Sequence, residues 1–320
     1  MRAFLTDDLT AAPKFADIPT PEPGPTDVVV EIAACGLNFA DLLMAKGKYQ
    51  EKPPLPVTLG LEVAGTVSAV GTDVETLHVG QRVAVYSGHG GLAEVGAFPA
   101  ARCVPLPDSM SLTDAAGFQI AYGSSHLALA HTARLQPGER LLVLGAAGGV
   151  GLTAVEIGKV MGAEVIASAR GPEKLAQARA AGADHLIDSN DDTLRETVKA
   201  LGGADVVYDP VGGPAFTEAF RACNPEARML LIGFAGGDLP EIKPNHLLVK
   251  NISVHGFYWG GFLKFNPTAL TDSLSQLFAW YDEGRIKPHI SHVLPFDRVE
   301  EGMELLRTRK STGKVVIQIA

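Results

Sequence analysis

A glycine-rich turn in the middle of the chain is the clearest candidate for chemistry. The apolar run Arg140–Leu144 leads into the segment GAAGGVG at residues 145–151, and a stretch with helical spacing follows. Between a strand and a helix, such glycines permit a tight turn, close approach of the backbone to a pyrophosphate, and close helix packing. The first N–H groups of that helix, and its dipole, attract phosphate. The segment departs from the G-x-G-x-x-G pattern at Ala146. A plain glycine-rich turn is the alternative, but the position between strand and helix favours a dinucleotide site. The cofactor-contacting residues expected here are Gly148, Gly149, Val150 and Gly151.

The end of the next expected strand, Val165–Ala167, bears on the choice of cofactor. A site for NAD usually carries an acidic residue there, which accepts hydrogen bonds from the ribose hydroxyls. Here Arg170 follows the strand with no acid beside it, and its guanidinium can pair with a 2′-phosphate through two charge-assisted bonds. Lys174 stands one helical turn further on. Both could be ordinary solvated cations, but together they predict NADPH as the cofactor.

The pattern around this turn indicates how it is positioned. Apolar runs alternate with helical stretches from about residue 123, at residues 141–144, 165–167, 185–187, 205–208 and 229–232, with a possible sixth strand at 251–254. Such alternation predicts an α/β domain with a Rossmann-type, doubly wound parallel sheet covered on both faces. We assign residues 123–257 to this dinucleotide-binding domain.

The first third of the chain has a different rhythm. Short β-branched runs separated by Gly, Pro and Asp lie at residues 28–32, 62–67 and 82–85, which predicts a compact, mainly β domain. A helix is expected from Asn38 to Lys46, with Asn38 as its N-cap. After about residue 260 the sequence predicts helices at 270–281 and 299–307 and a last strand at 314–319. We expect that tail to fold back on the N-terminal domain, so that residues 1–122 and 258–320 form one unit.

Composition narrows the class of partner. The chain has 320 residues and a net charge of -9, with 36 acidic against 27 basic residues. Such a surface is ill suited to nucleic acid or an anionic membrane, so we expect a small-molecule substrate. The longest run without charged residues, 115–133, is too polar to span a bilayer, and the N-terminus lacks the apolar region of a signal peptide. Three dispersed cysteines predict no disulfide framework, and together these features favour a cytoplasmic protein.

Motifs along the whole chain occur in the order of a known family. They are CGLNFAD at 35–41, PLPVTLGLEVAG at 54–65, AAGGVG at 146–151, DPVGG at 209–213, GFYWG at 256–260 and KSTGKVV at 310–316. Together they resemble the medium-chain dehydrogenase/reductase superfamily, specifically its zinc-free quinone oxidoreductase branch, the zeta-crystallin-like enzymes. The resemblance implies that the mainly β domain is a GroES-like catalytic domain.

The resemblance also implies a site without a catalytic metal. Zinc-dependent members of the superfamily supply a Cys, a His and a further Cys or Asp. The equivalent positions here are Asn38, Leu61 and approximately Ala116, and these side chains do not form a zinc site. Glu62 remains alone beside Leu61, and the segment 86–94 is short and has no cysteine, so we expect no structural zinc either.

The remaining site residues follow from the resemblance. The candidate catalytic residues are Asn38, Tyr49 and Tyr122; additional cofactor contacts are expected from Asn38, Ser124, Ser189, Phe234, Phe257 and Lys310. The resemblance puts Asn38 near the nicotinamide ribose and Phe234 beside the nicotinamide. The alternatives are that Asn38 only caps its helix and that the aromatic residues only fill a core or a dimer contact. Two positions depart from the family. Leu43 stands where some members have a cleft tyrosine, and Ser189 replaces a tyrosine that helps to hold the 2′-phosphate.

Three functions remain open at this point. The first is NADPH-dependent reduction of quinones or α,β-unsaturated carbonyl compounds; the second is reduction of an enoyl thioester. The third is an NADPH-binding structural or regulatory protein with little turnover, since a fold does not fix a function. The proton donor and the physiological substrate stay undetermined. Because the strand at 251–254 would end its sheet and relatives pair edge to edge there, we expect a homodimer.

Overall fold

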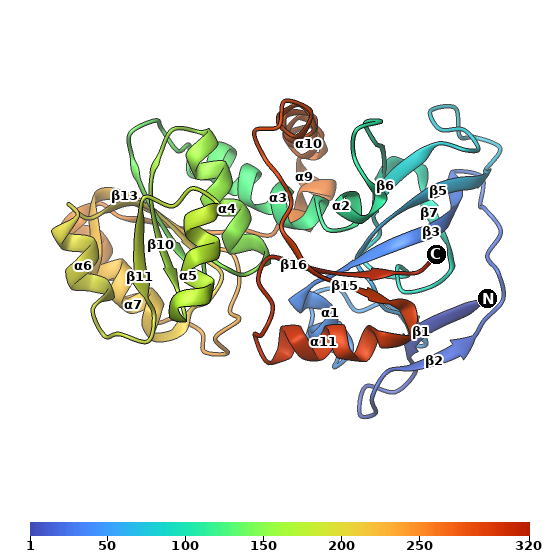
Figure 1. Ribbon diagram of the computed structural model, residues 1–320, viewed down its shortest axis with the longest axis horizontal. Coiled ribbons are helices and arrows are strands. Elements are labelled where there is room, and N and C mark those ends of the chain that lie inside the picture. Colours follow the sequence, from blue (N-terminus) through green and yellow to red (C-terminus); the bar gives the residue numbers. More distant parts are fainter. The chain divides into compact units, whose positions relative to one another are not determined.

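Figure 1 shows the computed structural model, which describes residues 1–320. The chain forms two units: one consists of Met1–Ile120 and Pro288–Ala320, the other of Ala121–Lys287. We call them the β unit and the nucleotide unit. The first division thus lies at residue 120, where 122 was expected, but the second lies at 288, where 258 was expected.

The difference at the second division has a local cause. Helix α10 (Pro267–Asp282) packs on the π-helical segment η2 (Leu127–Thr132) of the nucleotide unit. At that contact His126 Nδ1 lies 2.8 Å from Ser273 Oγ, and its ring meets that of Trp280 edge-on at 5.0 Å. The amphipathic pattern of α10 predicts a buried face but does not say which unit covers it.

The β unit is built on a seven-stranded sheet. Its order is β15-β16-β3-β5-β6-β8, with β7 also paired to β3. The strands are β3 (Asp27–Leu37), β5 (Glu62–Val70), β6 (Arg82–Tyr86), β7 (Val95–Pro99), β8 (Cys103–Pro105), β15 (Ile290–Pro295) and β16 (Lys314–Gln318). The last strand runs antiparallel to β3, with Val315 opposite Leu37. The C-terminal segment from 288 onward therefore joins the sheet of the N-terminal residues.

Smaller elements complete the β unit. A second sheet has the order β2-β1-β4. These elements are β1 (Arg2–Thr6), β2 (Lys14–Asp17), β4 (Val57–Thr58), α1 (Phe39–Met44), η1 (Ala100–Arg102), α2 (Leu112–Ala116), η4 (Phe296–Arg298) and α11 (Val299–Arg307). Helix α11 buries Val299, Gly302 and Met303 and packs against β15 and β16. A β-carbon at Gly302 would lie 2.7 Å from Leu37 Cδ1, so glycine allows the helix to approach β3 closely.

The nucleotide unit has the expected doubly wound, parallel six-stranded sheet. Its order is β11-β10-β9-β12-β13-β14, and every neighbouring pair is parallel. The strands are β9 (Arg140–Leu144), β10 (Glu164–Ala169), β11 (His185–Asp188), β12 (Ala204–Asp209), β13 (Cys223–Leu231) and β14 (Ser253–Gly256). The remaining elements are α3 (Gln119–His126), α4 (Gly149–Val160), α5 (Gly171–Ala180), α6 (Leu194–Ala200), α7 (Gly213–Ala222), α8 (Pro244–Lys250), η3 (Trp259–Gly261) and α9 (Phe262–Phe265). The fold class expected from the sequence is confirmed.

Alternation along β9 fixes the two faces of this sheet. Leu142 and Leu144 enter a core cluster with Phe216 and Phe220 of α7. Leu141 points to the other face, where a β-carbon on Gly158 of α4 would lie 2.6 Å from Leu141 Cδ2. All four apolar residues of the strand are therefore buried, which explains its continuous apolar sequence.

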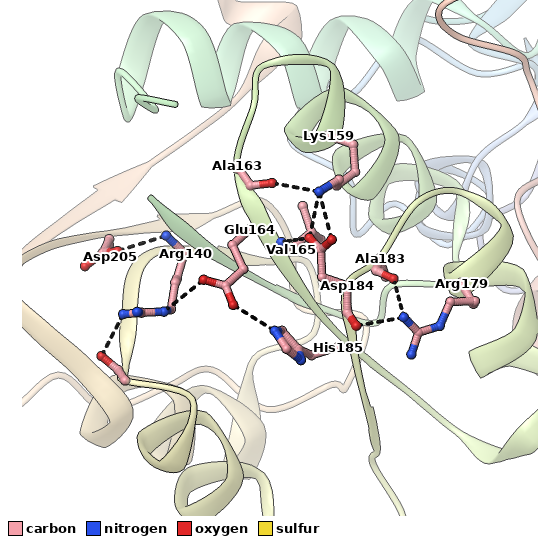
Figure 2. A network of polar contacts seen from close by, with 11 residues as sticks. Arg140, Lys159, Ala163, Glu164, Val165, Arg179, Ala183, Asp184, His185 and Asp205 are labelled. Carbon is pink, nitrogen blue, oxygen red and sulfur yellow. Dashed lines mark hydrogen bonds and ion pairs between the residues drawn. The ribbon is translucent and has the colours of Figure 1, made fainter. Parts of the chain in front are cut away.

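A polar network covers the edge where β9, β10 and β11 begin (Figure 2). Glu164 accepts a hydrogen bond from Arg140 Nε at 3.1 Å and lies 2.8 Å from His185 Nε2. Nearby, Lys159 Nζ donates to both Asp184 oxygens at 2.9 and 2.7 Å. Burial alone would raise the pKa of Asp184, but Lys159 and the Val165 amide outweigh it and hold that pKa below its usual value. The network closes the end of the sheet opposite the glycine-rich turn, so its role is to stabilise the strand ends.

Candidate cofactor-binding site and buried polar cluster

Two glycines of the turn do separate jobs. Gly145 has φ +58°, and Ala146 N donates to Ser168 O at 2.9 Å, which ties the turn to β10. A β-carbon on Gly151 would lie 2.2 Å from the Gly145 carbonyl oxygen, so only glycine permits the first turn of α4 to pack there. A β-carbon on Gly148, the exposed N-cap, would have its nearest neighbour at 3.4 Å. Gly151 is therefore needed for close packing of α4. Gly148, which has no side chain, leaves the first unpaired N–H groups of α4 accessible to a ligand.

Buried hydroxyl groups form hydrogen bonds with the first turn of α4. Ser125 Oγ lies 2.9 Å from Val150 O, 2.8 Å from Thr153 Oγ1 and 3.0 Å from Tyr208 Oη. Thr153 Oγ1 also donates to Ala121 O at 3.0 Å. Burial raises the pKa of Tyr208, so its phenol stays protonated within hydrogen-bonding distance of Ser125 Oγ. The sequence prediction named the neighbouring Ser124, which is buried; it missed Ser125 because only the phase of α3 shows which serine meets α4.

The end of β10 carries the expected cation and an unexpected acid. Arg170 is exposed at the N-cap of α5, and the half-buried Lys174 follows on that helix. Asp188, at the end of β11, accepts a hydrogen bond from Gly171 N at 3.0 Å. The amides of Asn190 and Gly171, and the charge of Arg170, lower the pKa of Asp188. A carboxylate thus stands beside Arg170, contributed by the next strand in the sheet.

Ser189 lies in the same corner. Its backbone N–H donates to Ala169 O at 2.9 Å, which joins the ends of β10 and β11. Its side chain is exposed. The structure therefore brings Arg170, Asp188 and Ser189 together at one edge of the sheet.

The ends of β12 and β13 form the other side of the turn. Strands β9 and β12 are neighbours, so the strand order reverses between them, where doubly wound folds bind ligands. Asp209 accepts hydrogen bonds from Val211 N at 2.7 Å and Gly212 N at 2.9 Å. Its second oxygen, Oδ2, is buried without a partner, and burial raises the pKa of this carboxyl.

The aromatic candidates of the nucleotide unit lie just beyond these strands. Phe234 follows β13 and is 39% exposed; a β-carbon on Gly212 would lie 3.2 Å from its Cδ1 atom. Phe257 follows β14, where its N–H donates to Leu231 O at 3.1 Å, and its ring lies 5.7 Å from that of Phe262. Phe234 is therefore available to a ligand at the switch point, whereas Phe257 is half-buried.

Tyr122 does not present a free hydroxyl. Its side chain is buried, and its hydroxyl donates to Glu156 Oε2 at 2.5 Å. Glu156 Oε1 in turn accepts from Lys287 N at 2.7 Å. The phenol thus joins α3 to α4, and its pairing with a carboxylate makes it a poor proton donor for a substrate.

The other predicted residues belong to the β unit. Tyr49 is half-buried in the loop after α1. Lys310 is exposed after α11, with its N–H donating to Leu305 O. Asn38 is the N-cap of α1, as the sequence predicted, but its side chain takes part in a larger cluster.

This buried cluster comprises Asn38, Asp41, Glu62 and Lys314. Lys314 Nζ donates to Glu62 Oε1 at 2.7 Å and to Asn38 Oδ1 at 2.8 Å. Asn38 Nδ2 donates to the same Glu62 oxygen at 3.0 Å. The second Glu62 oxygen accepts from Ile120 N at 2.9 Å. Asp41 accepts from Asn38 N at 2.8 Å and from Gly60 N at 3.0 Å, while burial raises its pKa to about 7.

The chemistry that these side chains permit is limited. The thiols of Cys35, Cys103 and Cys223 are buried, and burial raises the pKa of each, so none is a ready nucleophile. Leu61 is buried and apolar, and no three His, Cys, Asp or Glu side chains converge to hold a metal ion. No helix is long and apolar enough to cross a membrane. The open groups are the glycine turn with its helix N-terminus, the cation at the end of β10, and Phe234.

Comparison with known proteins agrees with this arrangement. Residues 24–108 match the alcohol dehydrogenase GroES-like domain and residues 149–277 the zinc-binding dehydrogenase family. The chain is 38% identical to quinone oxidoreductase-like protein 2 of Mus musculus over 99% of this chain and 92% of that protein. The quinone oxidoreductase of Thermus thermophilus, solved alone and with NADPH, is 33% identical, with a TM-score of 0.88 over the whole of both chains. Escherichia coli quinone oxidoreductase complexed with NADPH gives a TM-score of 0.92 at 26% identity, again over both whole chains.

Proposed function

Because the chain belongs to the zinc-free quinone oxidoreductase branch of the medium-chain dehydrogenase/reductase superfamily, we propose that it transfers hydride from NADPH to quinones or α,β-unsaturated carbonyl compounds. The observation that carries this proposal is the turn at residues 145–151, where Gly148 leaves the N-terminus of α4 open to a pyrophosphate. The solved relatives named above that were crystallised with NADPH support the choice of cofactor.

Different residues of the nucleotide unit would bind different parts of NADPH. The first N–H groups of α4 receive the pyrophosphate, and the hydroxyls of Ser125 and Thr153 keep that turn in place. Arg170 and Lys174 supply positive charge for a 2′-phosphate, and the exposed face of Phe234 covers the nicotinamide. The cofactor supplies the hydride, and the protein holds the two reactants in attack geometry and excludes water.

The residues at the positions equivalent to zinc ligands favour conjugated acceptors as substrates. Asn38 and Leu61 provide no zinc site, so the Lewis acid that assists exchange between alcohols and ketones is not supplied by this chain. In a quinone or an enone, the developing charge spreads to an oxygen that ordinary hydrogen bonds can stabilise. The three thiols are buried and their pKa values are raised, so the proposed transfer involves no cysteine adduct.

Deuterium transfer tests this proposal directly. NADPH deuterated at the transferable position is incubated with an enone panel and a quinone panel, and the products are examined by mass spectrometry and NMR. We expect deuterium at the β-carbon of the enone and oxidation of NADPH with quinones. Faster oxidation of secondary alcohols than reduction of enones would contradict it. Tight NADPH binding without turnover would instead indicate the structural or regulatory alternative, and turnover confined to enoyl thioesters the second alternative.

We further propose a cytoplasmic homodimer. Strand β14 ends the six-stranded sheet and leaves one edge unpaired. On α8, which packs beside β13, Leu248 and Val249 are 77% and 75% exposed. An unpaired edge with apolar side chains next to it is suited to a second copy of the chain. The three buried, unpaired cysteines fit a reducing compartment.

A further inference from the structure

A buried lysine lies at the centre of the polar cluster of the β unit. Lys314 begins β16, and only 5% of its surface is exposed. Its ammonium group donates to Leu37 O at 2.9 Å as well as to Asn38 Oδ1 and Glu62 Oε1. An ammonium group has three N–H bonds, so every one of its donors is used inside the cluster.

These contacts leave the Asn38 carboxamide a single orientation. Its oxygen faces the ammonium of Lys314, while its Nδ2 donates to Gly36 O at 3.2 Å and to Glu62 Oε1 at 3.0 Å. A flip of the amide would turn its NH2 group toward the ammonium and its oxygen toward a carboxylate and a carbonyl. Each of those contacts would be repulsive and unpaired in a buried site, so the flip is strongly disfavoured.

The surroundings leave little freedom for rearrangement. A β-carbon on Gly36 would lie 2.1 Å from Ala116 O and 3.0 Å from Glu62 Oε1. One on Gly117 would lie 3.4 Å from Lys314 Cβ. The ammonium therefore ties together the segments around Asn38 and Leu61, and the stem of Lys314 lies beside Gly117, which follows Ala116. Those segments contain the positions that correspond to zinc ligands in the metal-dependent members.

We infer that Lys314 is a positioning residue for the reaction proposed above, fixing the half-buried Asn38 carboxamide in the orientation that the site uses. Glu62 is the second support, since one of its oxygens accepts from both Lys314 and Asn38. All three donors of Lys314 are committed inside the protein, so none is left to donate to substrate or cofactor. The inference rests on the proposed function only for its effect on turnover; the orientation of Asn38 is measured independently.

The test uses a variant that keeps charge balanced. Lys314→Met alone leaves the Glu62 carboxylate buried and unpaired, which destabilises the fold, so the informative protein is Lys314→Met combined with Glu62→Gln. The control is Lys14→Met, which removes an exposed lysine, 59% accessible, that pairs with Asp7. We expect the double variant to reduce kcat/KM for the acceptor by about a hundredfold, as displaced catalytic geometry can. Its affinity for NADPH, which the nucleotide unit largely provides, should change less than threefold, and the control should match the wild type.

A nuclear magnetic resonance readout separates this inference from the proposed function. The side-chain NH2 signals of Asn38, identified through Asn38→Asp, should be protected from exchange in the wild type and shift and lose protection in the double variant. A folded double variant with wild-type turnover and unchanged Asn38 signals would overturn the inference. If the wild type itself lacks turnover, the proposed function fails while the signals still test the positioning. If the double variant does not fold, the wild type still tests the inference. Hydrogen exchange of its Asn38 NH2 group as fast as that of the exposed Asn245 would overturn the inference.

Discussion

The two glycines of the nucleotide turn can be separated by adding one methyl group to each. In Gly151→Ala the new carbon would meet the Gly145 carbonyl oxygen at 2.2 Å, together with further backbone atoms at 2.8 and 3.0 Å. Backbone cannot rotate away as a side chain can, so α4 must move. Overpacking of this kind costs about 1–3 kcal/mol. For a unit of this size, each kcal/mol lowers Tm by about 2–4 °C, so we expect a loss of about 2–12 °C.

Gly148→Ala should do the reverse. Its new methyl has its nearest neighbour at 3.4 Å, an ordinary contact, and Gly148 has φ -79°, which alanine adopts without strain. Stability should therefore stay the same or rise by about 0.4–1 kcal/mol through loss of chain entropy in the unfolded state. The methyl would project from the exposed N-cap toward the phosphates. Losing one hydrogen bond to a charged group costs about 1.5–3 kcal/mol, so Kd for NADPH should rise by about ten- to a hundredfold.

Calorimetry measures both quantities on the same samples. Differential scanning without cofactor reports the stability of each variant, and titration with NADPH reports affinity. Wild-type affinity in Gly148→Ala would show that the pyrophosphate does not approach this turn. An unchanged Tm in Gly151→Ala would refute the packing assigned to α4.

Four further outcomes follow from the described contacts. Arg170→Asp should weaken NADPH binding much more than NADH binding. Asp188→Asn removes the neighbouring negative charge and should increase the preference for NADPH. For either variant, equal changes in the dissociation constants of NADPH and NADH would contradict the assignment of this corner to the 2′-phosphate. The purified protein should hold no stoichiometric zinc by elemental analysis, and chelators should leave its activity unchanged. Light scattering at micromolar concentration should give twice the 33.6 kDa mass of the chain, and a monomer would exclude the β14 pairing. Burial raises the pKa of Asp41 from 3.8 to about 7. Between pH 3.8 and about 7, Asp41 is therefore protonated in the folded state and ionised in the unfolded state. Stability should therefore fall as pH rises from about 4 to 7, by at most about 4 kcal/mol, and this part of the slope should vanish in Asp41→Asn, as followed by urea unfolding.

The repeating pattern of the nucleotide unit is readable from the sequence because each signal is local. Continuous apolar runs mark strands that are buried on both faces, and the glycine turn at 145–151 lies between a strand and a helix as expected. Helix α11 has the bounds predicted from its amphipathic spacing, Val299–Arg307. Tertiary contacts decide what the sequence leaves open. The apolar face of α10 could be covered by either unit. Which of Ser124 and Ser125 contacts α4 depends on the rotation of α3 about its axis.

The acid beside Arg170 shows the limit of reasoning from one strand end. The sequence lacks an acid after β10, and on that ground alone it favours a 2′-phosphate. The parallel pairing of β10 with β11 places Asp188 opposite Ala169, so an acid reaches the same corner from elsewhere in the chain. Two backbone amides already hold this carboxylate, which limits its effect on a bound ligand. We therefore expect cofactor preference to depend on the balance between Arg170, Lys174 and Asp188, and the two substitutions at Arg170 and Asp188 measure their contributions.

The Lys314 cluster could not be predicted from local pattern, because Lys314 and Glu62 are 252 residues apart in the chain. One signal was nevertheless present: each is a charged residue that begins a strongly apolar strand, and two such residues of opposite sign are candidates for a buried pair. An apolar replacement of a buried ion pair is often neutral or stabilising, so the pair is weak evidence for stability. Its geometric effect is stronger, because one donor of the ammonium, one oxygen of Glu62 and the Gly36 carbonyl oxygen hold one carboxamide at the start of α1. A metal ion would hold its ligands by coordination; here an ammonium and a carboxylate hold the same segments by hydrogen bonds, and the group that they orient is Asn38.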